Sequence, residues 1–159
     1  MDRNHVFITD DSTLVPDDAA VAIIRDDEGK YLLQHRDEKP GIFFPDHWGF
    51  FGGALEPGET PAQALIRELA EELDIHVEER TLNQLTVFGF DFEFAGGPRI
   101  DRTFFELSPG NDQLRSLDLG EGQDFGFFSG DEALTRLRLA PYDGFALWIH
   151  SNQDRIARG

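Results

Sequence analysis

The segment from residue 60 to residue 75 constrains the fold more than any other stretch, because it predicts a helix with a defined beginning and one apolar side. Thr60 and Gln63 have the spacing of a capping box, and Pro61 occupies the first helical position. The apolar residues that follow recur with the period of an α-helix. They are Ala62, Leu65, Ile66, Leu69, Ala70 and Leu73. The sequence therefore predicts an amphipathic helix that begins after Thr60.

Strand patterns lie on both sides of this helix along the chain. The apolar runs at Ala19 to Ile24 and within Lys30 to Arg36 flank the acidic glycine turn at residues 26–29, which predicts a β-hairpin. Four phenylalanines between Phe88 and Phe94 alternate with glycine or acidic residues, as in a half-buried strand. Ile100 to Leu107 can return beside that strand after a glycine-rich turn.

The C-terminal part adds a strand and two helices. Residues 108–124 are rich in Asp, Gly and Ser and are expected to form a loop, and Phe125 to Phe128 is a short strand. Ser129 can cap a helix through Leu137, and the apolar spacing from Tyr142 to Ile156 predicts a last helix. Strands and helices interleave without a strict βαβ repeat, so we predict an α/β fold with a mixed sheet between helices.

Composition limits the classes of function. The 159 residues are expected to form one domain, 1–159, in which residues 1–18 are a loose arm or an edge strand. There are 31 acidic residues against 14 Lys and Arg, a formal charge of −17, which argues against a nucleic-acid partner. The chain has no cysteine, so a metal must be held by oxygen or imidazole ligands. No leader pattern or long apolar run is present, so we expect a cytoplasmic protein without membrane contact.

Three glutamates of the predicted helix are candidate metal ligands. Glu68, Glu71 and Glu72 are spaced i, i+3 and i+4, so their carboxylates project from one side of the helix, beside the apolar stripe. Like charges so close repel one another, and a cation would relieve the repulsion. Mg²⁺ or Mn²⁺ fits, because hard divalent cations prefer oxygen ligands and keep positions for substrate phosphates. The alternative is a solvated acidic face that binds nothing.

Residues around the helix favour the metal site. Gly52 and Gly53 can bring backbone carbonyls close to a metal, because glycine has no Cβ to clash. Glu59, at the end of the preceding loop, can pair with Arg67 of the helix and so fix the carboxylates in place.

In this region the sequence resembles the Nudix hydrolase family. The family's box is a glycine, five residues, a glutamate, seven residues, Arg-Glu, a hydrophobic residue, any residue, Glu-Glu, any residue, a glycine and a hydrophobic residue. Here these positions are Gly53, Glu59, Arg67, Glu68, Leu69, Glu71, Glu72, Asp74 and Ile75. Only Asp74 departs, standing in place of the last glycine. Aspartate tolerates a left-handed backbone better than most residues, so a helix can still end there.

The resemblance implies a Nudix-type α/β/α sandwich that hydrolyses a phosphoanhydride bond in a nucleoside triphosphate or another small molecule linked to a nucleoside diphosphate. It implies that Glu68, Glu71 and Glu72 bind Mg²⁺ or Mn²⁺, with the carbonyl of Gly52 as a further ligand. Glu59 and Arg67 would then orient these carboxylates. The resemblance also implies a general base, for which the candidates are Glu71 or Glu72 of the box and Glu121 in a glycine-flanked loop. The alternative for Glu121 is an ordinary surface acid without a catalytic role.

Candidate substrate contacts lie outside the box. Arg36, at the end of a predicted strand, can touch a phosphate, or it makes only a surface salt bridge. Trp48, Phe43 and Phe44 can stack on a nucleobase, or they belong to the core, as aromatic side chains in such a run more often do.

Two other functions remain open. A nucleotide-sugar hydrolase would use the same box, and a non-catalytic Nudix module would bind a nucleotide and regulate a partner. The retained Glu68, Glu71 and Glu72 favour an enzyme over the regulatory module. Arg99 and Arg102 can meet a phosphate or, in a homodimer, the partner subunit.

Overall fold

Side chains cover both faces of β1 (Ala19–Ile24), and all six of its residues are buried. The computed structural model describes residues 17–38, 43–93, 98–117 and 124–157. Alternate residues of β1 pack into two separate apolar clusters, one containing α1 (Pro61–Leu73) and the other containing α4 (Pro141–Ser151). This follows from the two-residue period of a strand, and it makes β1 the centre of the fold.

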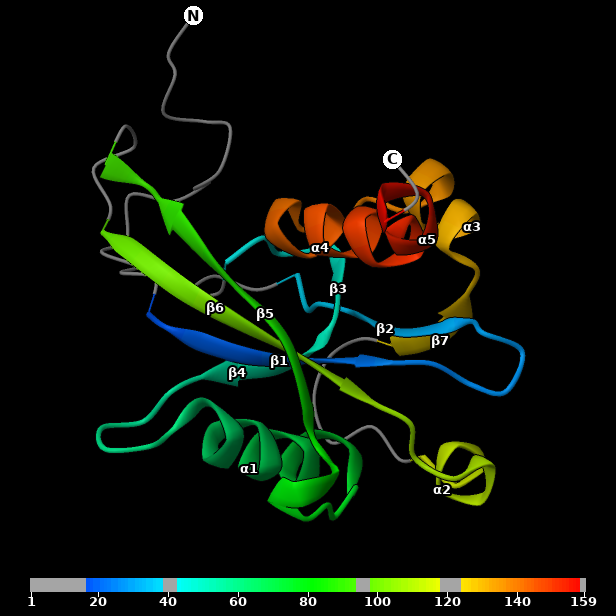
Figure 1. Cartoon of the computed structure of the whole chain (residues 1–159), viewed down its shortest axis with the longest axis horizontal. Helices are drawn as coiled ribbons and strands as arrows, with labels where there is room; N and C mark the ends of the chain where they lie inside the picture. The colour runs from blue at the N-terminus through cyan, green and yellow to red at the C-terminus, as the bar shows by residue number, and fades with distance from the viewer. Residues whose placement is uncertain (1–16, 39–42, 94–97, 118–123, 158–159) are drawn as a thin grey trace, which may run out of the picture.

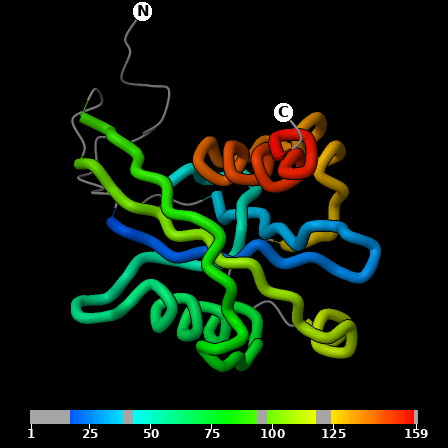
Figure 2. The backbone as a smooth tube through the Cα atoms, in the orientation of Figure 1, coloured from blue at the N-terminus to red at the C-terminus, as the bar shows by residue number. Residues whose placement is uncertain are grey.

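The described strands form two sheets. The larger one contains, in spatial order, β4 (Phe51–Ala54), β1, β6 (Arg99–Leu107) and β5 (Asn83–Asp91). The smaller one contains β3 (Trp48–Gly49), β2 (Tyr31–His35) and β7 (Asp124–Phe128). In the larger sheet β1 runs parallel to β6 and antiparallel to β4, so this sheet is mixed, as predicted. The two sheets lie between α1 on one side and α3 (Gly130–Arg136), α4 and α5 (Gln153–Ala157) on the other, which confirms the α/β sandwich (Figures 1 and 2).

The predicted hairpin between the first two strands is wrong in its pairing. The turn itself is present: a side-chain oxygen of Asp26 accepts hydrogen bonds from the backbone amides of Glu28 and Lys30, at 3.0 and 2.8 Å. However, β1 and β2 belong to different sheets and share only the isolated bridge between Arg25 and Tyr31. The reason is that β4 and β6 already occupy the two edges of β1.

The ends of α1 confirm the sequence reasoning. Thr60 and Gln63 form both hydrogen bonds of a capping box, at 3.2 and 3.0 Å. Asp74, in place of the family's glycine, adopts a left-handed conformation with φ 53° and ends the helix. The prediction that an aspartate permits this ending is therefore confirmed.

The strands from Phe88 onward are also largely as predicted. Phe88 and Phe90 are half-buried in β5, alternate with exposed Gly89, and pair antiparallel to β6. The strand begins earlier than expected and ends at Asp91, while Phe94 lies outside the described residues.

Two predictions in the C-terminal part need correction. The expected loop at 108–124 contains a short helix, α2 (Asn111–Arg115), while residues 118–123 are outside the described part. The single last helix is two helices, because Asn152 interrupts it with φ −111° and ψ 9°. The side-chain amide of Asn152 donates to the carbonyl of Trp148 at 2.8 Å, and such local bonds compete with helix continuation. The capped helix after Ser129 is confirmed, with Glu132 completing its capping box.

Among the residues described, no helix has the length and apolar character needed to span a membrane.

Candidate metal and catalytic site

The box helix α1 lies against the glycine-containing strand β4. The amide of Gly52 donates to a carboxylate oxygen of Glu72 at 3.1 Å. Gly52 has φ 139°, and a Cβ at this position would collide with the carbonyl oxygen of Ala20. A Cβ on Gly53 would collide with the carboxylate of Glu68. The two glycines therefore let the backbone of β4 approach two box carboxylates closely.

Arg67 holds the box acids together. Its guanidinium makes two hydrogen bonds to Glu59, at 2.8 and 3.0 Å, and one to Glu68 at 2.7 Å. It also lies 3.6 Å from Glu71 and donates to the carbonyl of Ala54 at 3.1 Å. The predicted pairing of Glu59 with Arg67 is confirmed, and it ties the loop before α1 to the helix. We call Glu59, Arg67, Glu68, Glu71 and Glu72 the box cluster.

The pairing shifts the ionisation of both partners. Hydrogen bonds from Arg67, and then from the backbone amide of Glu56, lower the pKa of Glu59 from 4.5 to about 2. The hydrogen bond to Glu59, together with that to Glu68, raises the pKa of Arg67. Glu59 and Arg67 are therefore both charged throughout the physiological pH range.

The donor atoms of the box cluster fit a hard divalent cation. Glu68, Glu71 and Glu72 offer only carboxylate oxygens, and the side chain of Glu71 is 62% exposed. Within the described ranges, no three His, Asp or Glu side chains lie close enough together to hold a metal ion by themselves. Mg²⁺ commonly takes one or two carboxylates and completes its shell with water and substrate phosphates, so an open set of oxygen donors suits it.

The predicted substrate contacts have different surroundings. The side chain of Arg36 donates to the carbonyl of Phe43 at 2.9 Å. Trp48 is half-buried and its ring stacks on His35, with centroids 4.8 Å apart. Phe44 is 6% exposed and packs edge-on against Tyr142. Phe44 thus belongs to the core, which was the alternative to stacking on a nucleobase. Arg36 and Trp48 each keep part of their side chain at the surface.

Arg102 and Glu121 are the other two candidates that need comment. Arg102 is 7% exposed and forms an ion pair with Asp143, with Nε and Oδ1 3.0 Å apart, so it does not offer its charge to a phosphate or a partner subunit. Glu121 lies outside the described residues.

Sequence reasoning missed Asp143 and Gln34, two buried polar residues near β3 and β4. An acidic residue in the first turn of a helix is a common stabilising feature, so the position of Asp143 in the predicted last helix could have drawn attention to it. Nothing in the sequence indicated its partner Arg102, which is 41 residues away.

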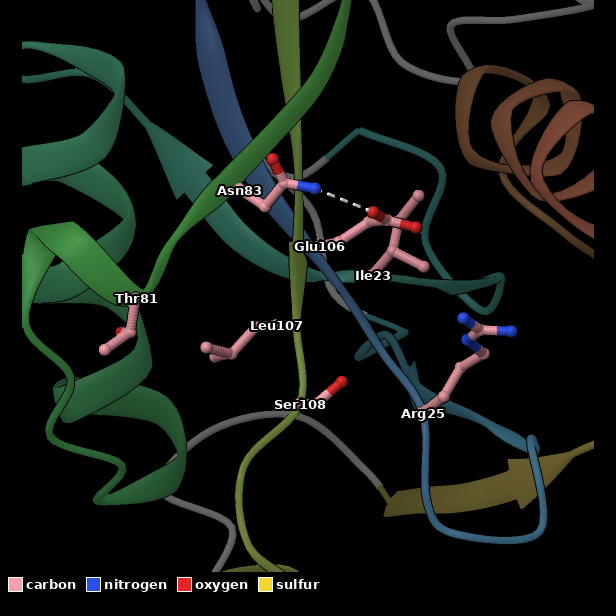
Figure 3. Close-up of a pocket in the computed structure, with 7 residues that line it drawn as sticks. All are labelled: Ile23, Arg25, Thr81, Asn83, Glu106, Leu107 and Ser108. Atoms are coloured by element: carbon pink, nitrogen blue, oxygen red, sulfur yellow. Dashed lines mark hydrogen bonds between the residues drawn. The ribbon is translucent and has the colours of Figure 1, made fainter.

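A second polar group lies at the other end of β1, where Glu106 pairs with Ile23. The hydroxyl of Tyr31 and a carboxylate oxygen of Glu106 hydrogen-bond to the two ring nitrogens of His150, at 2.7 and 2.5 Å. Asn83 donates to the other oxygen of Glu106 at 3.0 Å, beside a pocket of about 330 Å³ (Figure 3). We call Tyr31, Asn83, Glu106 and His150 the far network. The hydrogen bond to His150 lowers the pKa of Glu106, and burial raises that of Tyr31.

The comparison with known families agrees with the geometry of the box cluster. The family model described as NUDIX domain matches residues 15–147. The chain belongs to the NUDIX domain family. Among curated proteins, the nucleoside triphosphatase NudI of Enterobacter sp. (strain 638) is 43% identical over 58 residues, and that of Escherichia coli O1:K1 / APEC is 40% identical over 63 residues. These matches cover 36% and 40% of this Nudix chain, and only 40% and 42% of the respective relatives.

Solved structures show the same Nudix fold. The MutT protein of Methanosarcina mazei Go1 superposes with a TM-score of 0.70 at 19% identity, covering 91% of this chain and 99% of that one. The E. coli ORF135 protein gives a TM-score of 0.64 at 27% identity, with coverage of 87% and 92%.

Proposed function

We propose that this Nudix protein is an Mg²⁺-dependent pyrophosphohydrolase. Its substrate would be a nucleoside triphosphate or another small molecule linked to a nucleoside diphosphate, and the bond cleaved a phosphoanhydride. The name of the NudI relatives, nucleoside triphosphatase, makes the triphosphates the first substrates to test.

The observation that carries the proposal is that several carboxylates surround Arg67 beside the glycine-containing strand β4. Arg67 lies between 2.7 and 3.9 Å from the carboxylates of Glu56, Glu59, Glu68 and Glu71. Glu72 adds another carboxylate, bonded to the amide of Gly52. Five negative charges against one positive charge attract a cation, and a cation in turn lets an acidic protein hold a phosphate chain.

The residues of the box cluster would divide the work. Glu68 and Glu72, which approach β4, would hold Mg²⁺, and the carbonyl of Gly52 would add an oxygen. The pair of Glu59 and Arg67 would hold the loop before α1 in a fixed position relative to the helix. Glu71 or Glu72, or Glu121 in the downstream loop, would accept the proton of the attacking water. When bound, the cation neutralises phosphate charge and makes phosphorus easier to attack.

A substrate panel tests this proposal. Purified protein is incubated with nucleoside triphosphates, nucleotide sugars, ADP-ribose and dinucleoside polyphosphates, in Mg²⁺ or in EDTA. We expect Mg²⁺-dependent release of phosphate or pyrophosphate from triphosphates, lost in Glu68→Gln and retained in Glu79→Gln, a matched change of an exposed acid in η2 (Glu79–Thr81).

Other outcomes identify the rival functions. Turnover of nucleotide sugars without turnover of triphosphates would make the protein a nucleotide-sugar hydrolase. Nucleotide binding with no turnover of any compound would contradict the enzyme and favour the regulatory module.

A further inference from the structure

Two buried side chains hold the backbone of one residue, Phe50, where the chain passes from one sheet to the other. Phe50 lies between β3 and β4 and belongs to neither strand. Its amide donates to Oδ2 of Asp143 at 3.0 Å, and its carbonyl accepts from the side-chain amide of Gln34 at 3.2 Å. Asp143 is 2% exposed and Gln34 is 5% exposed. The backbone bonds of Phe50 are therefore supplied by side chains from α4 and β2.

The Asp143 carboxylate is itself fixed. Arg102 of β6 donates to its two oxygens at 3.0 and 3.2 Å, and the guanidinium lies 4.0 Å from the ring centre of Tyr142. A Cβ on Gly49 would stand only 2.6 Å from Oδ2 of Asp143, so the backbone of β3 lies directly against this carboxylate. A buried charged pair keeps its geometry because each charge needs the other, and separating them is costly.

Phe50 is two residues before Gly52, whose amide contacts Glu72 of the box cluster. Gly52 donates to Glu72, and it pairs with Val21 across β4 and β1. Three bonded residues span only about 7 Å when extended, so a shift at Phe50 passes directly to Gly52. Figure 1 shows β3 running from beside α4 toward β4, and backbone bonds of Trp48 to Arg138 and Ala140, each 2.8 Å, hold the start of this path.

We propose that Arg102, Asp143 and Gln34 are positioning residues for the hydrolytic site. They fix the backbone N–H and C=O of Phe50, and through them the place of the Gly52 backbone relative to the carboxylate of Glu72. This inference rests on the proposed function. In this proposal none of the three side chains touches substrate, since all three are buried.

A pair of double variants isolates the hydrogen bond to Phe50 from the buried charge. Arg102→Met with Asp143→Asn removes both charges but keeps an oxygen that can accept from the amide of Phe50. Arg102→Met with Asp143→Leu removes the charges and this acceptor at similar volume. We expect the leucine form to lose kcat on the order of 10²-fold relative to the asparagine form, with little change in KM, because small displacements of a reacting group have effects of that size. It should also need more Mg²⁺ for half-maximal rate.

Amide hydrogen exchange gives a readout independent of turnover. The amides of Phe50 and Gly52 should exchange at least about 10-fold faster in the leucine form than in the asparagine form, since a lost hydrogen bond of about 1.4 kcal/mol corresponds to tenfold. If either double variant fails to fold, Gln34→Leu replaces it as the test. This change removes the hydrogen bond to the carbonyl of Phe50 and should also lower kcat and speed exchange at Gly52. Glu106→Gln in the far network controls for the general effect of altering a partly buried polar group and should change neither readout.

The positioning role would be overturned if the two double variants had equal kcat, an equal Mg²⁺ requirement and equal exchange at Gly52. Turnover by the wild type would still leave the proposed function intact in that case. If the wild type hydrolyses no substrate, the proposed function fails, and unchanged exchange at Gly52 then overturns the coupling as well.

Discussion

The two ends of β1 carry polar groups that are organised in opposite ways. At the start of the strand, where Ala20 and Val21 pair with Gly53 and Gly52, the box cluster gathers acids around Arg67. At the other end of the strand, each member of the far network has a matched partner: hydroxyl to imidazole, imidazole to carboxylate, and amide to carboxylate.

The difference is one of charge balance, and it underlies the proposal that the far network stabilises the fold while the box cluster binds a cation. The far network satisfies its own hydrogen bonds, and among the described residues no buried side-chain polar atom lacks a partner. The box cluster instead keeps an excess of negative charge that a cation can relieve. In this proposal, a site is indicated by an excess of negative over positive charge and not by acidic residues alone.

The largest expected effect comes from removing one carboxylate at each end. Glu72→Gln should lower kcat by at least about 100-fold, since even residues that only support metal ligands cost about 10- to 100-fold when changed. Glu106→Gln should leave kcat within about 3-fold, because Glu106 belongs to the far network. Steady-state kinetics at saturating Mg²⁺ measures both, and similar losses in the two variants would erase the distinction between the ends.

The far network should matter for stability. His150→Leu leaves the hydroxyl of Tyr31 and the carboxylate of Glu106 without their shared partner, so the free energy of unfolding should fall by about 1–3 kcal/mol. The matched control is His76→Leu, because His76 is exposed and its ring hydrogen-bonds to nearby Asp74, at 2.9 Å. Urea denaturation measures both variants, and an equal effect in the two would contradict a structural role for the far network.

A smaller effect is expected from pH at the box cluster. Folding lowers the pKa of Glu59 from 4.5 to about 2, so its pairing with Arg67 contributes fully above about pH 4.5. That contribution is lost as the pH falls toward 2. The stability difference between wild type and Glu59→Gln should therefore be present at pH 6 and shrink progressively from pH 4.5 to pH 2.5. Denaturation midpoints at these pH values check this, and a constant difference would show that the carboxylate charge is not what holds the pair.

Local sequence patterns were sufficient for α1, for the capped helix α3 and for the pairing of Glu59 with Arg67, but not for α2 or for the break between α4 and α5. The capping residues Thr60 and Gln63, the period of α1 and the left-handed Asp74 are set by interactions within a few residues, so the sequence shows them directly. The pairing of Glu59 with Arg67 could also be predicted, because Glu59 directly precedes the N-cap of α1 and Arg67 lies about two helical turns further on.

Interactions between distant segments could not be read in the same way. The pattern of β1 and β2 indicates two strands but not that they join different sheets, because alternation is the same whichever neighbour a strand has. Asp143 and Arg102 each look like an ordinary surface charge in the sequence, and only the fold brings them together in the core.

Direct binding of Mn²⁺, measured by isothermal titration calorimetry without nucleotide, tests most simply whether the surplus acid of the box cluster is a cation site. We predict saturable binding by the wild-type protein, weakened at least about 10-fold in Glu72→Gln, as expected for loss of a metal-site group, and unchanged in Glu106→Gln. Equal binding by all three proteins, or none by the wild type, would contradict the account.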